Sequence, residues 1–258
     1  MAILALKKGI SAEIYKYRST FVFWFVLLAP AFIPAINLIA FLRRGDAIVA
    51  RGGTAWENLM QFSSGPANFL FPFFVIIVAL FVNTIESNSN TWKLIYAQPL
   101  SRLNVFCSKM LVYIAMLFCS LMLFGLMTYA VGWLLHLANP DLGFADPFNL
   151  WHLLGNCFTI FLATLGFGSI HFYLSQRTKN LILPLGIGVG GIVSFMILVQ
   201  GWEYARYHPY GYHVLSSGPV GTENFSLWSH MEPVYLSLAL AAVVFSIAAI
   251  DTQRKRII

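Results

Sequence analysis

The clearest chemistry in this sequence lies between Glu86 and Lys109, in a polar and basic interval between two long apolar runs. Residues 88–91 have the turn and N-cap chemistry that favours a short helix beginning near Trp92. Pro99 ends such a helix because it lacks an N–H, and Ser101 can cap the helix that follows. The pattern predicts a short helix at a membrane surface, with one apolar and aromatic face and with Arg102 and Lys109 at the start of the next span.

Nucleotide-binding and hydrolytic patterns are absent from the sequence. No G-x-x-x-x-G-K-[ST] occurs, so the chain has no Walker loop for ATP phosphates. Gly186, Gly188, Gly190 and Gly191 lie in an apolar run with no preceding strand. Gly186-xxx-Gly190 is instead typical of close helix packing, either within the chain or between two subunits. We predict that the chain is not an enzyme and has no catalytic residues.

Serine and histidine residues do not form a recognisable catalytic or metal-binding pattern. Gly168-Ser169 with His171 lacks the spacing of an intramembrane serine protease, which needs its histidine on another span. Five of the 6 histidines fall in segments predicted to face outward, but their spacing matches no ligand motif. These are His136, His152, His208, His213 and His230. We predict no metal site and no cofactor bound by this chain.

The elements that position these residues are membrane helices. Of 258 residues, 59% are hydrophobic and 10% are charged, with a mean hydropathy of +0.73; about 25% are charged in a typical soluble domain. The apolar runs are continuous, so helices are expected instead of barrel strands. The predicted spans are 20–42, 67–85, 110–135, 150–174, 181–201 and 233–250. The expected fold is a single all-α integral membrane domain over residues 1–258, with six transmembrane helices.

The basic residues predict the orientation of the spans. Of the 16 lysines and arginines, four lie in the segments assigned to the outer side: Arg43, Arg44, Arg51 and Arg206. The other twelve lie in the termini and in the loops after spans two and four, as the positive-inside rule requires of cytoplasmic segments. Both termini are therefore predicted to be cytoplasmic. The net charge of +6 then reflects topology and contact with lipid head groups, so no nucleic-acid partner is expected.

Segments between and within the spans carry further predictions. Residues 1–19 form an amphipathic interfacial helix with Ile14 and Tyr17 on its apolar face. Pro30 and Pro34 should kink the first span. Residues 43–66 are expected to form a glycine-containing outer loop, and the aromatic segment 202–232 to lie at the outer interface. A groove lined by Phe, Leu, Met, Asn37, Thr164 and Ser194 would suit a bulky amphiphile.

The polar interval also fits a longer pattern, E-x4-T-W-K-x5-P-x-S-R-x5-S-K. This pattern resembles the segment between the second and third spans of bacterial ABC-2-type transporter permeases, especially the lantibiotic and bacitracin immunity group. The resemblance implies that residues 86–104 form a cytoplasmic coupling segment that contacts an ATPase. The residues it implies for ATPase coupling are Glu86, Thr91, Trp92, Lys93, Pro99, Arg102 and Lys109.

The resemblance further implies the partners and the location of the chain. It implies two cytoplasmic ABC ATPase subunits that carry the ATP and Mg, a second copy of the permease or a related permease, and surrounding membrane lipids. Residues 202–232 would include a re-entrant segment, and the chain would lie in the bacterial cytoplasmic membrane. The expected function is export of an amphiphile such as a peptide antibiotic, drug or lipid-like compound. Metal, cofactor, polysaccharide or lipid export, a non-transporting membrane anchor and an intramembrane enzyme remain alternatives.

Overall fold

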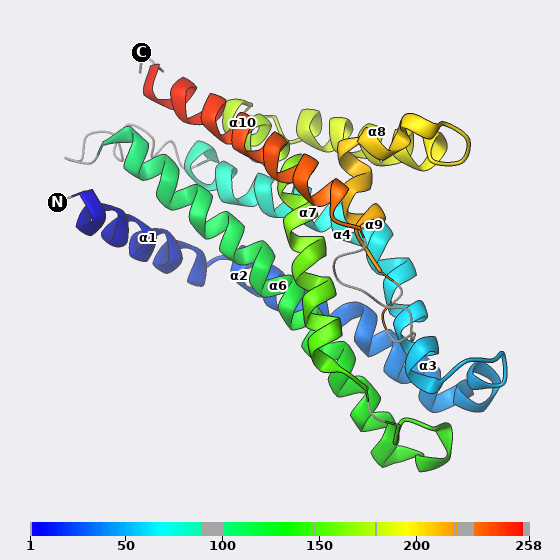
Figure 1. The fold of residues 1–258 in the computed structure, drawn as a ribbon. Coiled ribbons are helices and arrows are strands. Elements are labelled where there is room, and N and C mark those ends of the chain that lie inside the picture. Colours follow the sequence, from blue (N-terminus) through cyan, green and yellow to red (C-terminus); the bar gives the residue numbers. More distant parts are fainter. Residues whose placement is uncertain are drawn as a thin grey trace.

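A computed structural model describes residues 2–88, 101–146, 148–178, 180–218, 220 and 230–254. Within these ranges the chain is helical and contains no strand (Figure 1). The longer helices are α1 (Ala2–Arg18), α2 (Phe21–Leu28), α3 (Phe32–Val49), α4 (Ala55–Asn88), α6 (Arg102–Ala138), α7 (Leu150–Arg177), α8 (Ile182–Leu198) and α10 (Glu232–Arg254). Short elements are the 3-10 helices η1 (Ala29–Ala31), η2 (Pro140–Leu142), η3 (Glu203–Tyr207) and η4 (Pro209–Gly211), and the single turn α9 (Tyr212–Leu215).

The helices confirm an all-α protein of the multi-pass membrane class. Among the described residues, five helical segments are long and apolar enough to cross a bilayer: Phe21–Val49, Ala55–Thr84, Arg102–Ala138, Leu150–Arg177 and Glu232–Arg254. The fifth predicted span, 181–201, is shorter than expected because helix α8 has 17 residues and ends at Leu198. At about 1.5 Å per residue, α8 is about 26 Å long, against a hydrocarbon thickness of about 30 Å.

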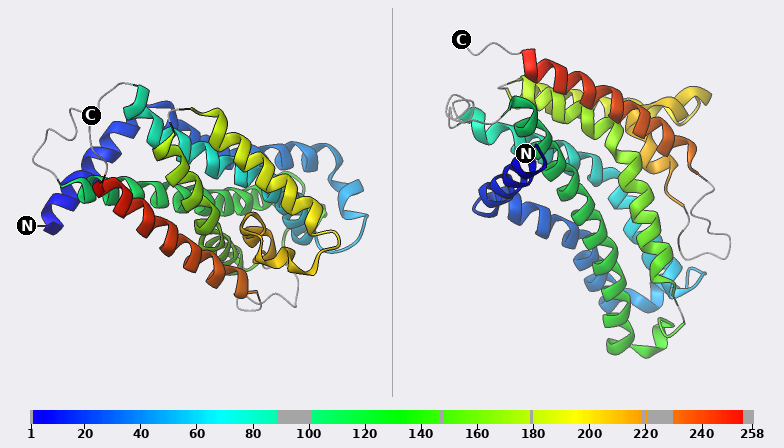
Figure 2. Two further views of the ribbon diagram at one scale, coloured as in Figure 1. Left: turned by 90° about the horizontal axis from the view of Figure 1, so that it is seen from above. Right: turned by 60° about the vertical axis from the view of Figure 1, so that its left-hand side comes forward.

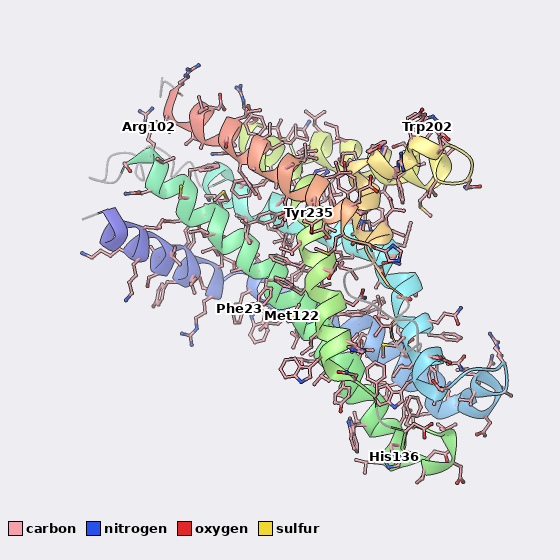
Figure 3. All side chains as sticks on the ribbon, viewed as in Figure 1. Phe23, Arg102, Met122, His136, Trp202 and Tyr235 are labelled. Carbon is pink, nitrogen blue, oxygen red and sulfur yellow. The ribbon has the colours of Figure 1, made fainter. Side chains whose placement is uncertain are left out.

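The segments predicted to be cytoplasmic gather at one end of the molecule. Both chain ends lie there, together with the start of α6 at Arg102, whereas His136 near the end of α6 lies at the opposite end (Figures 1 and 3). The turn between α7 and α8 belongs to the same end, because Arg177 Nε lies 3.1 Å from Asp251 Oδ2 near the end of α10. The distribution of lysine and arginine along the sequence predicted that these segments lie on the same side of the membrane.

The predicted outer loop at 43–66 is wrong, because nearly all of it is helical. Helix α3 is kinked at Arg44, where the backbone angles are not helical, and a further helical stretch runs to Val49; α4 begins at Ala55. A capping box starts α4: the Thr54 N–H donates to Glu57 Oε2 at 2.8 Å, and the Glu57 N–H donates to Thr54 Oγ1 at 3.1 Å. Gly45 is not a flexible point but packs directly on Leu142 of η2. The long helices therefore extend well beyond the predicted spans at this end.

Helices α7 and α10 lie side by side and form the tightest pair (Figure 2). The Ser237 hydroxyl of α10 donates to the Leu162 carbonyl at 3.0 Å and accepts from the Gly166 N–H at 2.8 Å. Gly166 allows this approach, since a β-carbon there would meet Ser237 at 3.0 Å. Gln176 also donates to Thr252 Oγ1 at 2.9 Å, so the pair is joined along its length.

The described part of the 202–232 segment folds back onto the helices. Trp202 and Tyr204 are half exposed, in agreement with an interfacial position. Tyr210 and His213, by contrast, are buried against Phe167 of α7. The segment thus has an exposed aromatic part followed by a part inserted among α4, α7 and α8.

Candidate coupling junction and transport cavity

Helix α1 packs on the beginning of α6 through three residues spaced one turn apart: Gly9, Glu13 and Tyr17. Gly9 lies directly against Ser108 of α6, where any larger side chain would overlap. Tyr17 is 1% exposed, and its hydroxyl donates to the Val82 carbonyl of α4 at 3.0 Å. Ile14, predicted to lie on the apolar face of α1, is exposed, so it does not take part in this packing. The face that packs combines a small residue, an acid and a phenol.

Lys109 completes this junction from α6. Its side chain is 1% exposed, and Nζ donates to the same Val82 carbonyl at 3.0 Å while lying 3.9 Å from Glu13 Oε2. Glu13 also accepts from Lys16 at 2.6 Å. A buried ammonium is costly unless it is paired and hydrogen-bonded, so these contacts hold three helices in one arrangement. We name this set of Glu13, Tyr17, Val82 and Lys109 the α1 junction.

The α1 junction lies at the base of the predicted coupling segment. Glu86 belongs to the last turns of α4, and Arg102 is the first residue of α6, where Ser101 Oγ accepts from the Asn104 N–H as predicted. Lys109 contacts α1 and α4 inside the protein, and its predicted role in ATPase coupling stays a prediction. Thr91, Trp92, Lys93 and Pro99 lie outside the described residues.

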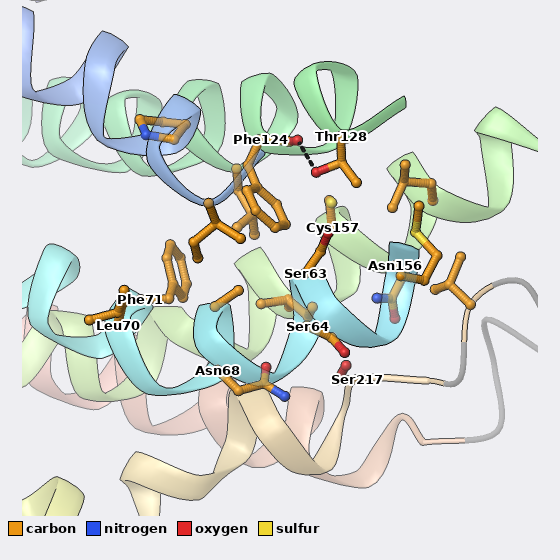
Figure 4. Close-up of a pocket in the computed structure, with 18 of the residues that line it drawn as sticks. Ser63, Ser64, Asn68, Leu70, Phe71, Phe124, Thr128, Asn156, Cys157 and Ser217 are labelled. Carbon is orange, nitrogen blue, oxygen red and sulfur yellow. Dashed lines mark hydrogen bonds between the residues drawn. The ribbon is translucent and has the colours of Figure 1, made fainter. Parts of the chain in front are cut away.

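A cavity of about 1010 Å³ lies between α2, α3, α4, α6 and α7, and Ser217, Gly218 and Val220 close part of it (Figure 4). Six phenylalanines and four leucines are among its described lining residues, residue types that the predicted groove also contains. Asn37, Thr164 and Ser194, however, are not among the described lining residues. Asn37 instead donates to Ser63 Oγ at 2.8 Å, and Thr164 donates to the Ile160 carbonyl of its own helix at 2.7 Å.

The polarity of the cavity changes from one end to the other along α4. Glu57, Gln61, Ser64 and Asn68 are spaced four, three and four residues apart, so they form one polar stripe facing the cavity. Beyond Asn68 every α4 lining residue is apolar: Leu70, Phe71, Phe73, Phe74 and Ile77. The other helices show the same change of polarity. Thr128 and Asn156 line the polar end, and in the apolar end the ring of Phe25 stacks on that of Phe74 with 5.3 Å between the ring centroids. Sequence reasoning missed this stripe because three of its four residues, Glu57, Gln61 and Ser64, fall in the segment predicted to be a loop.

Prolines interrupt the backbone hydrogen bonding in the walls of the cavity, and at Pro30 and Pro72 a side chain from another element binds the freed carbonyl. Pro30 cannot donate to the Val26 carbonyl, and this break appears as the 3-10 turn η1, which confirms the predicted kink. The Ser120 hydroxyl of α6 donates to that carbonyl at 2.8 Å. This contact replaces the backbone hydrogen bond that Pro30 removes.

The second break lies at Pro72 within α4, which cannot donate to the Asn68 carbonyl. His213 Nε2 lies 3.0 Å from that carbonyl and must carry the proton, because a carbonyl can only accept. His213 lies on α9, outside the spans, and is 2% exposed. Burial lowers its pKa to about 4, although the hydrogen bond to Asn68 acts in the opposite direction. The ring is therefore neutral near pH 7.

The glycines of α8 separate into two faces. Gly188 packs tightly against Ile76 and His171, and Gly191 against Tyr210. A β-carbon added at Gly186 or Gly190 would meet no atom within 4 Å, so the expected Gly186-xxx-Gly190 packing does not occur against the described residues of this chain. Its alternative form, a contact with a second subunit, stays a prediction.

The residues considered for catalysis and metal binding have structural contacts. Ser169 donates to the Gly166 carbonyl at 2.6 Å, while His171 Nε2 pairs with Tyr210 at 2.7 Å, so the two do not face each other as a catalytic pair. His208 pairs with Ser194 at 3.1 Å. In the part of the chain that the structure describes, no three His, Cys, Asp or Glu side chains are grouped to hold a metal ion.

Comparison with known families identifies the class of this protein. The family described as "ABC-2 family transporter protein" matches residues 9–195, from α1 through most of α8. The match covers well over half of the chain, so the protein belongs to the ABC-2 transporter family and is a multi-pass membrane transport component. A search of curated proteins found no match.

Proposed function

We propose that this chain is the permease subunit of an ATP-binding-cassette exporter that moves an amphiphile outward across, or out of, a bacterial cytoplasmic membrane. The observation that carries the proposal is the family match over residues 9–195, which includes the whole coupling segment 86–104. Members of this family normally work with ATPase subunits. ATP and Mg would bind to those separate subunits, and two permease chains would form the transport unit.

The α1 junction and the cavity give this proposal a physical basis. Because α1, α4 and α6 are joined where the coupling segment leaves and re-enters the helices, movement of that segment would be passed to α4. Helix α4 also forms the longest wall of the cavity. In this topology the end with both termini is cytoplasmic, and α8 is the fifth of six spans.

The test is purification of the full chain from its native membrane in mild detergent, followed by mass spectrometry and an ATPase assay. An ATP-hydrolysing subunit should be recovered with the unchanged chain. The Trp92→Ala chain should fold normally. Either the ATPase should no longer be recovered with it, or ATP hydrolysis should no longer drive transport. Trp151→Ala is the matched control, because Trp151 is 78% exposed on α7 near the opposite end.

Two results would count against the permease function. Recovery of the chain without any ATPase would favour an anchor or enzyme. Full transport by the Trp92→Ala chain would remove the coupling role from residues 86–104.

A further inference from the structure

We propose that the cavity along α4 binds a lipid-like amphiphile whose head group has hydroxyl or amide groups and no negative charge, with its apolar chain directed toward Phe74 and Ile77. This inference rests on the proposed function, since it names the substrate class and its binding site.

The length and size of the cavity suit such a molecule. Ile77 lies 20 positions after Glu57 on α4, so the lining of this helix is about 30 Å long at about 1.5 Å per residue. About 16 Å of this length, from Glu57 to Asn68, is polar, and the remaining 14 Å or so is apolar. A volume of about 1010 Å³ is at the upper end of the range for small-molecule sites.

The end-to-end separation of polarity selects a lipid-like molecule over a peptide. A peptide with alternating side chains would need polar partners distributed along the whole cavity. Here the aromatic end is formed by Phe25, Phe71, Phe74 and Phe124, and the polar end by the α4 stripe with Asn156 and Ser217. An amphiphile with its head at one end and its chain at the other buries each part against matching surface.

The charge of the lining selects against an anionic head. No lysine, arginine or histidine is among the described residues that line the cavity, and Glu57 is its single acidic side chain. Asn, Gln, Ser and Thr can both donate and accept hydrogen bonds, which suits hydroxyl and amide groups. A carboxylate or phosphate would be partly buried here without a cation to pair with, and this is costly.

The proposal can be tested with two photoreactive probes in lipid nanodiscs. One is a monoacylglycerol with a diazirine at the end of its chain, and the other is the fatty acid with the same chain and diazirine, used in its ionised form. We expect the neutral probe to label 70–77 of α4 or 21–28 of α2, with competition by unlabelled monoacylglycerol. Labelling by the anionic probe should be at least about tenfold weaker, which corresponds to about 1.4 kcal/mol.

A charge substitution tests the same point without disturbing the core. Ser64 is exposed and lines the cavity, so Ser64→Arg should increase labelling by the fatty acid at these positions. Gly65→Arg is the matched control, because it adds the same charge one residue away, at a position that does not line the cavity. An unchanged ratio of the two probes in Ser64→Arg would overturn the proposal, as would equal labelling by both probes or labelling spread over all lipid-facing helices.

The two proposals fail in different ways in this experiment. If an ATPase is recovered with the same preparations but the cavity is not labelled, the permease function stands and the cavity proposal fails. If labelling occurs as expected but no ATPase is recovered, the binding site stands without the exporter.

Discussion

Ser120 should stabilise the protein only because Pro30 breaks the helix beside it. The Ser120 side chain is 2% exposed and donates to the Val26 carbonyl, whose usual helical donor is missing at Pro30. Hydrogen bonds between membrane helices average about 0.6 kcal/mol and reach about 1.7 kcal/mol. Leaving a buried acceptor unpaired costs about 1–3 kcal/mol. We therefore expect Ser120→Ala to lower the free energy of unfolding by about 1–2 kcal/mol.

The same substitution should cost much less when the proline is absent. In Pro30→Ala the backbone N–H of residue 30 can reach the Val26 carbonyl, so Ser120→Ala should then cost under about 0.5 kcal/mol. The resulting interaction energy of about 1 kcal/mol is measurable by a double-mutant cycle, with unfolding in mixed micelles followed by circular dichroism. Equal losses in the two backgrounds would refute this account of the break.

Ser175→Ala provides the matched control for this cycle. Ser175 is 1% exposed and its hydroxyl donates to the His171 carbonyl at 2.6 Å, within an unbroken part of α7. That carbonyl also has its regular backbone donor, because residue 175 is four positions after 171 in a continuous helix. Ser175→Ala should therefore lower the free energy of unfolding only slightly, and by the same amount in the unchanged chain and in the Pro30→Ala chain.

Two other predictions concern α8 and α9. Gly188→Ala would press a methyl group against Ile76, so it should lower the free energy of unfolding by about 1–3 kcal/mol. Gly186→Ala meets no neighbouring atom, so it should be neutral or stabilise the protein by up to about 1 kcal/mol through helix propensity. Thermal unfolding of the two variants tests this, and equal effects would contradict the packing of α8. The pKa of His213 is about 4 in the folded chain, against an ordinary value of 6.5 in the unfolded chain. The neutral ring therefore contributes fully to the free energy of unfolding above pH 6.5, and this contribution is lost as the pH falls toward 4. His213→Gln keeps an N–H donor without titrating, so its melting temperature should fall less over this pH range, and identical pH profiles would show that His213 is not responsible.

The class of the fold was predictable because it depends on composition and on long apolar runs. The cap at Ser101 and the kink at Pro30 were also predicted correctly, since both follow from local chemistry. The prediction failed between 43 and 66, where glycines and polar residues indicated a loop. The structure shows that Gly45 is a packing position and that Gln61 and Ser64 are polar because they face a cavity. Polarity within a membrane protein can thus indicate a lined cavity as well as a loop.

The cavity depends on tertiary contacts that no local pattern contains. A proline in a span predicts a free carbonyl four residues earlier, but it does not predict which side chain will bind that carbonyl. Here Ser120 lies 94 residues from Val26, and His213 lies 145 residues from Asn68. The first bond joins two helices that line the cavity, and the second joins the α4 wall to α9, so breaking either one would loosen a wall of the cavity without unfolding a span. If α4 moves with the coupling segment, the Pro72 break is the point at which the apolar end can shift relative to the polar stripe.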